Sequence, residues 1–388
     1  MFPIPSLKRL EVCCTRGSGR GSFKCTVSGS IFPNLTSLLI SRFFLPETAD
    51  AFQGVTNLTS LEVVDCRRLD NKFDWILSNR NLTKLVLYKS NKVDENLDAL
   101  LGQLSRLVNL ELTKCRLRDY RCIAKAQSLE YLVLDSNRAT LMDSSLDSFS
   151  TIPKLRSLRL SKAVLLTDNG MSSLSRHPIS SLDLDYCNMN GDGIASLAPF
   201  LTELRLMEAP RMKSTILATF LKLTSLTIGN RNADIECYSP LSALTNLTNL
   251  RVHGKTQRPK SFQWLSGLKF MRTLRLFSVP DIGVRSDQPP MEFLSNLQRL
   301  ELFQLDARWP SIYDWSILAS LPHLSTLIVA IKVRNVVLHV GNFFIIYKLI
   351  IIGDSAPYAD PVSRGGGQAS EGSEDIRERR GRNGRSIP

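Results

Sequence analysis

The stretch LTSLEVVDC (58–66) has a spacing that recurs along most of the chain. LVNLELTKC (107–115), LEYLVLDSN (129–137) and ISSLDLDYC (179–187) also place aliphatic residues first, fourth and sixth, and a Cys or Asn ninth. Alternate side chains of a strand point to opposite faces, so the fourth and sixth residues point inward while the fifth points to solvent. Each stretch therefore predicts one short strand that ends in a turn.

The first aliphatic position of each unit recurs at a regular interval. These positions are Leu7, Leu35, Leu58, Leu82, Leu107, Leu129, Leu155, Ile179, Leu201, Leu223, Leu247, Met271, Leu297 and Leu324. They define about fourteen units with a mean step of roughly 24 residues, and the pattern L-x-x-L-x-L-x-x-(N/C) resembles leucine-rich repeats. The resemblance implies an α/β solenoid, with a parallel sheet on the concave face and helices or loops on the convex face.

The chain divides into three predicted regions. Residues 1–331 form the repeat array, residues 332–352 an apolar segment that caps its C-terminal end, and residues 353–388 a tail whose Gly, Ser and charged residues predict disorder. The run VVLHVGNFFIIYKLIII (336–352) is expected to be a closing strand or helix. A membrane anchor is the alternative, but the run is barely long enough and contains His339, Asn342 and Lys348.

The segments between the strands change character along the chain. VDENLDALLGQL (93–104) predicts a helix that buries Leu97, Leu100, Leu101 and Leu104, and we expect Asp94, Asp168 and Asp192 to be helix N-caps. The run from Cys187 to Leu197 resembles the cysteine-containing subclass of leucine-rich repeats. Loops and short turns are instead expected in RNADIECYSP (231–240), KTQRPKSFQW (255–264) and PDIGVRSDQPP (280–290).

The tripeptide NLT begins at Asn34, Asn57, Asn81 and Asn246, each time directly before a first aliphatic position. This fixed place assigns the four asparagines to the repeat. The alternative is that they are glycan acceptors, which requires a secreted protein. The first ten residues, MFPIPSLKRL, lack the basic start and long apolar run of a secretory signal, so we expect a cytoplasmic or nuclear protein.

Composition favours a binding protein over an enzyme. The chain contains no P-loop, dinucleotide-binding, nucleophile-elbow or zincin motif, and its four histidines are scattered. The eight cysteines lack zinc-ligand spacing and are expected to be reduced and mostly buried, so we expect neither a metal nor a cofactor. The net charge of +13 is unusual and is compatible with an acidic partner, an anionic membrane surface or nucleic acid. Because the charges of the predicted tail nearly cancel, we expect the basic excess to lie in the repeat array.

The predicted partner site lies on the concave face of the later units. The solvent-pointing column carries Arg159, Arg205, Arg251 and Arg275, and then Glu301 between Leu300 and Leu302. His253, Phe277 and Phe303 lie beside it, and Arg299 flanks it. Arginine next to aromatic rings is typical of interface hot spots. Our hypothesis is that an acidic segment of a partner protein binds Arg205, Arg251, His253, Arg275, Phe277, Arg299 and Phe303. The alternative is that these are ordinary solvated side chains.

Several functions are compatible with such an array. Its repeat type resembles the substrate-recognition arm of F-box proteins in ubiquitin ligases. No F-box is found in this sequence, so an adaptor role would require an additional segment or another route to the ligase. The alternative is a basic solenoid that binds nucleic acid or another polyanion. Innate-immune receptors and Ran-type GTPase activators also carry related repeats, but neither a nucleotide-binding domain nor the activators' catalytic arginine can be matched here. A membrane partner is not expected.

Overall fold

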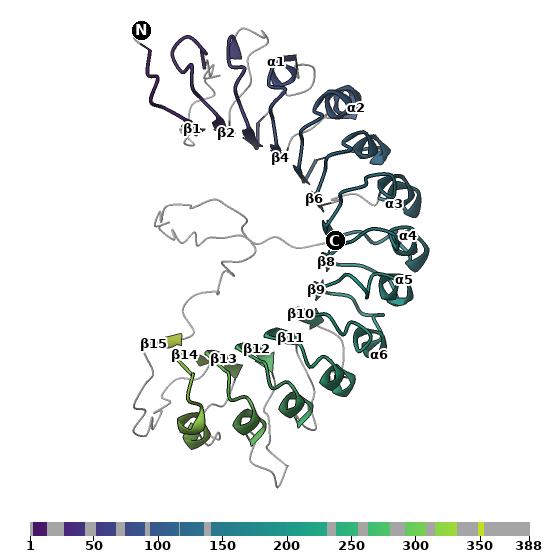
Figure 1. Cartoon of the computed structure of the whole chain (residues 1–388), viewed down its shortest axis with the longest axis vertical. Coiled ribbons are helices and arrows are strands. Elements are labelled where there is room, and N and C mark those ends of the chain that lie inside the picture. Colours follow the sequence, from purple (N-terminus) through teal and green to yellow (C-terminus); the bar gives the residue numbers. More distant parts are fainter. Residues whose placement is uncertain are drawn as a thin grey trace, which may run out of the picture.

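A computed structural model shows one curved solenoid, with strands lining the inside of an arc and helices on the outside (Figure 1). The structure describes residues 3–13, 27–42, 52–66, 74–89, 94–115, 117–135, 141–230, 238–254, 263–279, 292–307, 315–331 and 348–352. All strands belong to one 15-stranded sheet in sequence order, and every neighbouring pair is parallel. The predicted fold class is confirmed.

Each of the fourteen predicted units contributes one strand, and β15 lies in the predicted capping segment. The strands are β1 (Arg9–Cys13), β2 (Ser37–Ser41), β3 (Ser60–Val64), β4 (Lys84–Tyr88), β5 (Asn109–Thr113), β6 (Tyr131–Asp135), β7 (Ser157–Ser161), β8 (Ser181–Asp185), β9 (Glu203–Met207), β10 (Ser225–Asn230), β11 (Asn249–Gly254), β12 (Thr273–Val279), β13 (Leu302–Ala307), β14 (Thr326–Ile331) and β15 (Lys348–Ile352).

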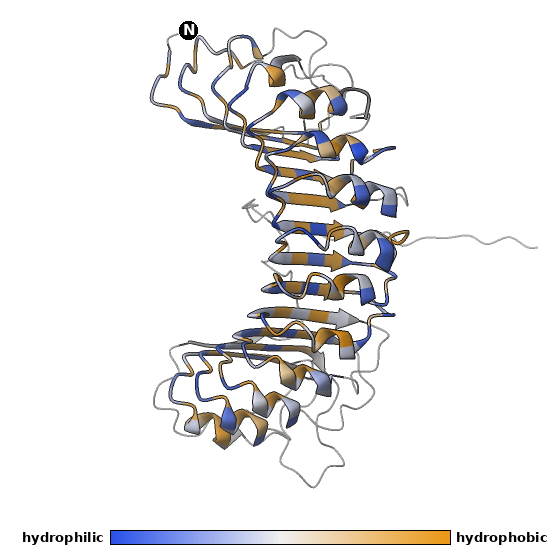
Figure 2. Ribbon diagram, turned by 45° about the vertical axis from the view of Figure 1, so that its right-hand side comes forward, coloured by the Kyte–Doolittle hydropathy of each residue, from blue (hydrophilic) through white to orange (hydrophobic). Residues whose placement is uncertain are grey.

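The strands form because their apolar residues alternate. In β3, Leu61 and Val63 are fully buried, whereas Glu62 between them is partly exposed. The same alternation of hydropathy runs along successive strands (Figure 2). The pairing has no offset between neighbouring units, as for Leu61 opposite Leu85. Strands lie about 4.8 Å apart in such a sheet, so equivalent side chains form straight columns across the units.

The residue after a strand turns the chain away from the sheet. Seven residues at this position have positive φ, namely Arg42, Asp65, Lys89, Lys114, Lys162, Tyr186 and Glu208. The N–H of Asp65 donates to the carbonyl of Tyr88 at 2.8 Å, and the N–H of Lys89 donates to that of Thr113 at 2.9 Å. Within the described residues, six of these seven turns, all but the one at Lys114, are stabilised by such a hydrogen bond to the next unit, which offsets their conformational cost.

Cysteines follow several of these turns and are buried. The thiol of Cys66 lies 3.6 Å from the Ile40 carbonyl, and that of Cys115 lies 3.2 Å from the Leu87 carbonyl. Burial raises the pKa of the Cys187 thiol to about 11. These three cysteines behave as small buried residues, as predicted, whereas Cys13 is exposed. Cys14, Cys25 and Cys237 lie outside the described residues.

The convex side changes from α-helices to 3-10 helices. The α-helices are α1 (Asp74–Leu77), α2 (Asp94–Gln103), α3 (Asp143–Phe149), α4 (Asp168–Ser172), α5 (Asp192–Ala195) and α6 (Ser214–Leu217). The 3-10 helices are η2 (Arg121–Lys125), η4 (Ser239–Ala243), η5 (Gln263–Gly267), η6 (Glu292–Asn296) and η8 (Trp315–Ser320). The four predicted leucines at 97–104 are buried. Residues 231–237, 255–262 and 280–290 lie outside the described residues, so the loops and short turns expected there stay predictions. Among the described residues, α6 is the last α-helix.

The predicted N-caps at Asp168 and Asp192 are wrong by one residue. Thr167 caps α4 by accepting the N–H of Asn169, and Gly191 occupies the N-cap position of α5. The Asp168 carboxylate instead accepts backbone N–H groups of the next unit, from Asn190 at 3.0 Å and from Gly191 at 2.9 Å. Asp168 therefore joins two units, a role that its position in its own helix does not reveal.

The NLT asparagines connect neighbouring units. The amides of Asn34, Asn57 and Asn246 donate to the carbonyls of Pro5, Pro33 and Leu221, at 2.8, 3.1 and 2.8 Å. The side-chain oxygen of Asn81 accepts from Arg106 at 2.9 Å. These hydrogen bonds agree with the assignment of the asparagines to the repeat.

The C-terminal end of the described sheet is formed by β15. It pairs with β14 in parallel, with Leu327 opposite Leu349. Residues 332–347 and the predicted tail 353–388 lie outside the described residues, so the proposed cap and tail stay predictions. Within the parts that the structure describes, no helix combines the length and the apolar character needed to cross a bilayer.

Candidate functional site on the concave sheet

The middle residue of each strand faces the hollow of the arc. Because neighbouring strands pair without offset from β1 to β12, these residues form one column, in which Arg159, Asp183 and Arg205 are consecutive and Arg251 is followed by Arg275. The column continues into β13 with Gln304, and the register of the β12–β13 pair shifts only after Leu276. Their side chains are those most available to a partner, because the residues on either side of them in each strand point into the core.

In the first part of this column, opposite charges pair with each other. Lys84, at the start of β4, contacts the column residue Glu62 at 2.7 Å. The carboxylate of Asp183 lies between two arginines, 2.6 Å from Arg159 and 2.8 Å from Arg205. Arg205, a predicted site residue, is therefore already bound to a carboxylate of its own chain.

The later part of the column contains a different arrangement, which we call the arginine–aromatic cluster: Arg251, His253, Arg275 and Phe277. The imidazole of His253 stacks on the ring of Phe277, with centroids 4.4 Å apart and planes inclined by 7°. The guanidinium of Arg251 lies 4.7 Å from the centroid of the same ring. Phe277 is only 8% exposed, so it holds the two polar side chains in place more than it offers surface of its own.

Gly229 makes room for this cluster. It pairs with His253 in the neighbouring strand, and a Cβ at position 229 would lie 2.7 Å from the Cβ of His253. Any side chain there would displace His253 and disturb its stacking on Phe277. Gly229 was not among the predicted site residues, although a glycine that interrupts a strand is a recognised signal of close approach.

Arg275 completes the cluster next to Arg251. Its Nε atom and the Oε1 atom of Gln304, which is opposite Arg275 in β13, are both buried and lack hydrogen-bond partners among the described residues. Two cations one strand apart, at about 5 Å, repel each other by roughly 1–3 kcal/mol between the dielectric limits of water and a protein surface. A bound carboxylate would relieve this repulsion.

The predicted position of Phe303 on the concave face is wrong. Phe303 is 0% exposed and pairs with Leu274, an inward residue of β12. The first apolar position of this unit is Leu300 and not Leu297, because the N–H groups of Glu301 and Leu302 bind the Arg272 carbonyl as equivalent residues do elsewhere. Gln304 therefore replaces Glu301 in the column, and it is 1% exposed.

The same shift separates Arg299 from the cluster. Arg299 lies ahead of β13, where its guanidinium stacks on Phe270, 4.7 Å from the ring centroid. It belongs to the edge of the solenoid at the start of the strands, and not to the concave face. The structure thus brings together four of the seven predicted site residues: Arg251, His253, Arg275 and Phe277.

The described parts of the chain contain no group of three or more His, Cys, Asp or Glu side chains that could hold a metal ion. Glu111 and Asp185 lie in the middle of the sheet, and burial raises the pKa of both carboxyl groups. A nearby cation partly offsets the rise in each pKa, Lys84 for Glu111 and Arg205 for Asp185.

No protein-family model matches the chain, and neither does any curated protein sequence. Solved structures do resemble it. Internalin InlF from Listeria monocytogenes has a TM-score of 0.50 and 21% identity, over 86% of this chain and 87% of its own. TLR13, solved in complex with ssRNA13, has a TM-score of 0.50 and 18% identity, over 82% of this chain and 54% of its own. A leucine-rich repeat protein from Leptospira interrogans has a TM-score of 0.46 and 16% identity, over 84% of this chain and 93% of its own.

The fold is a leucine-rich repeat solenoid. At these identities the likeness extends to the fold alone, because one fold carries many functions. The function therefore has to be inferred from the side chains of this solenoid, and above all from those that its own residues leave available.

Proposed function

We propose that this solenoid is a non-enzymatic binding scaffold that captures an acidic, extended segment of a partner protein on the concave face of β10–β13. The observation that carries the proposal is the arginine–aromatic cluster, where the guanidinium of Arg251 lies 4.7 Å from the Phe277 ring and His253 stacks on it. In the column, Thr227 precedes Arg251, Arg275 follows it, and Gln304 follows Arg275.

Pre-organisation supports this choice of site. An arginine held over an aromatic ring loses less side-chain freedom when it binds a carboxylate than a free arginine does. The neighbouring column residues Thr227 and Gln304 are neutral. Repeated carboxylates on an extended peptide would follow the column from one strand to the next.

The test uses a fluorescein-labelled peptide of ten glutamates and fluorescence anisotropy with the full chain. We expect the double variant Arg251→Glu, Arg275→Glu to abolish binding, because the cluster would then repel the peptide. The matched control is Lys154→Glu with Arg176→Glu, which changes the net charge equally at exposed positions away from the cluster. Equal loss of binding in both variants would show that net charge alone explains the effect, and it would contradict a site at the arginine–aromatic cluster.

A second variant isolates the aromatic platform. Phe277→Leu keeps the net charge and most of the apolar volume but removes the ring, so it should weaken peptide binding by about threefold to tenfold, as expected for a cation–π contact of about 1 kcal/mol. Wild-type affinity in this variant would show that the ring does not organise Arg251.

The narrower form of the proposal is a cysteine-containing repeat array that selects substrates for a ubiquitin ligase. It is supported only by the resemblance of the motifs at 58–66, 107–115 and 179–187 to that repeat subclass. Affinity purification followed by mass spectrometry separates it from a general scaffold. Recovery of ligase subunits supports the adaptor, whereas partners with acidic segments and no ligase subunits support the scaffold alone.

A further inference from the structure

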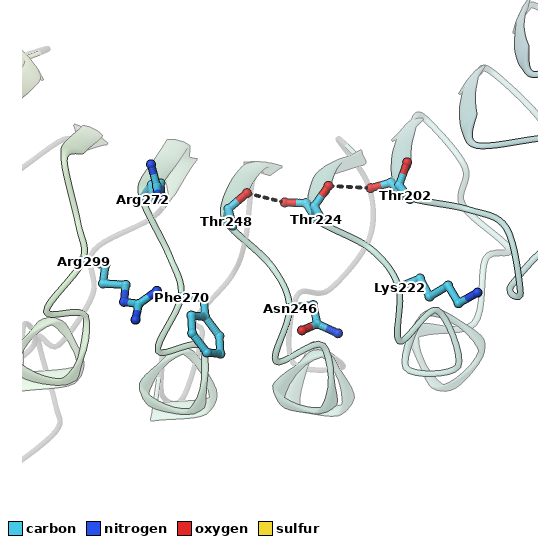
Figure 3. A pocket seen from close by; sticks show the side chains of 8 residues that line it. All are labelled: Thr202, Lys222, Thr224, Asn246, Thr248, Phe270, Arg272 and Arg299. Atoms are coloured by element: carbon cyan, nitrogen blue, oxygen red, sulfur yellow. Dashed lines mark hydrogen bonds between the residues drawn. The ribbon is translucent and has the colours of Figure 1, made fainter.

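A second surface lies on the side of the solenoid, where the chain enters β9–β12. It is an open hollow of about 500 Å³ lined by two rows of side chains (Figure 3). The row next to the strands consists of Thr202, Thr224, Thr248 and Arg272. Each unit also contributes one residue to the other row, which consists of Lys222, Asn246, Phe270 and Arg299.

The hollow is positively charged. Three of its eight lining residues are cationic and none is acidic. Lys222 and Arg299 are exposed and form no ion pair with any residue that the structure describes. Arg272 contacts Glu301 at 3.4 Å, but both side chains are more than half exposed, so this pair is weak and open to competition.

An aromatic ring lies between the cations. Phe270 is 44% exposed, although burial of such a ring is favourable, and the Arg299 guanidinium covers part of it at 4.7 Å from the centroid. Phe200, in the same row one unit before Lys222, is 41% exposed. An exposed ring close to cations in a groove is typical of surfaces that bind single-stranded nucleic acid.

The threonine row adds ordered hydroxyl groups. Thr224 donates to the carbonyl of Thr202 at 3.2 Å, and Thr248 donates to that of Thr224 at 3.0 Å (Figure 3). Because each hydroxyl proton is used in this way, the oxygen presents its lone pairs as acceptors. Base amino groups and the ribose 2′-hydroxyl are donors that match this row.

The spacing of the cations decides which ligand fits. Lys222 and Arg299 are three units apart in the sequence, which corresponds to about 15 Å at a strand spacing of about 4.8 Å. One phosphate bound through charged hydrogen bonds of about 2.8 Å cannot reach both. A chain of repeated anions can, and one that also carries planar groups can use Phe270. An acidic peptide supplies only the charge.

We propose that this hollow binds a short segment of single-stranded nucleic acid. The phosphates lie against Lys222, Arg272 and Arg299, and a base stacks on Phe270. This site is separate from the arginine–aromatic cluster, and it adds to the proposed function a second ligand on a different face of the solenoid.

The test measures anisotropy of fluorescein-labelled U10 and dT10 with the full chain. Phe270→Leu, which leaves charge unchanged, should weaken U10 binding at least about fivefold, as expected for loss of one stacked base. Lys222→Gln should lower the slope of log affinity against log salt by about 0.7, because one phosphate contact is lost. The control Lys154→Gln changes an exposed lysine of the same row outside the hollow and should leave both quantities unchanged.

The outcomes are distinguishable. Stronger binding of U10 than of dT10 supports contact between the 2′-hydroxyl and the threonine row, and equal binding supports contact through phosphate and base alone. Wild-type U10 affinity in Phe270→Leu, or an equal loss of slope in Lys154→Gln, overturns the proposal. If Phe270→Leu does not fold, the Lys222→Gln and Lys154→Gln pair still decides. Arg251→Glu with Arg275→Glu should keep U10 binding, so this proposal can fail or hold independently of the concave site.

Discussion

The arginines of the concave column have different surroundings in β7–β9 and in β11–β13, which we call the first and the second half of the column. In the first half, Arg159 and Arg205 both contact Asp183, so a carboxylate of the same sheet partly balances their charges. In the second half, Arg251 stacks on Phe277 beside Arg275, and no carboxylate follows in the column. We therefore propose the binding surface in the second half, where the column residues next to the arginines carry no acid.

The largest expected effect tests where the second half of the column lies. Phe303→Ala should destabilise the protein by about 3–5 kcal/mol, because it would empty a fully buried site in β13. The urea midpoint measures this loss. Glu301→Ala, at an exposed position two residues earlier, is the control and should have little effect. A small effect of Phe303→Ala on stability would indicate that Phe303 is exposed and that Glu301 occupies the column.

A smaller effect tests the paired half. Asp183→Asn should cost about 2 kcal/mol, because it removes the charge that two arginines bind while preserving the shape of the side chain. The shift of the thermal midpoint at pH 7 measures it. The variant should also bind the ten-glutamate peptide more strongly than the wild type, since the first half would then resemble the second. An unchanged midpoint would show that the ion pairs contribute nothing to stability.

The smallest expected effect is a gain in stability from a substitution at Asp185, two residues after Asp183. Burial raises the pKa of Asp185, so the folded protein binds this proton more tightly than the unfolded chain does. Stability therefore falls as the pH rises through the folded pKa, and Asp185→Asn should remove this cost and raise the midpoint slightly at pH 7. Below the unfolded carboxyl pKa of about 3.9 the gain should vanish. A gain that persists there would have another cause.

Spacing in the sequence was sufficient for most of the fold. The inward leucines of β3 to β12 were located because each unit repeats one short local pattern, and the buried leucines of α2 follow from helical periodicity. It was insufficient in β13, because Leu294, Leu297 and Leu300 are three residues apart and fit either a 3-10 turn or the start of a strand. Pairing with β12 and β14 decides between the two.

The candidate site was predictable only in part, for a similar reason. The sequence places Arg251, His253, Arg275 and Phe277 near one another, because equivalent positions of neighbouring units align. It does not reveal that Gly229 leaves the space for His253, that Asp183 occupies Arg205, or that Arg299 stacks on Phe270. Those facts depend on contacts between units some twenty residues or more apart.

By itself, the sequence determined a solenoid with one strand per unit, because the alternation that builds a strand and the step that stacks units are local properties. The tertiary structure alone decided which charges are available to a partner and where the last units place their aromatic rings. Those outcomes depend on the side chain that faces each residue from the next strand, and a one-dimensional pattern leaves that neighbour undefined wherever its register is ambiguous.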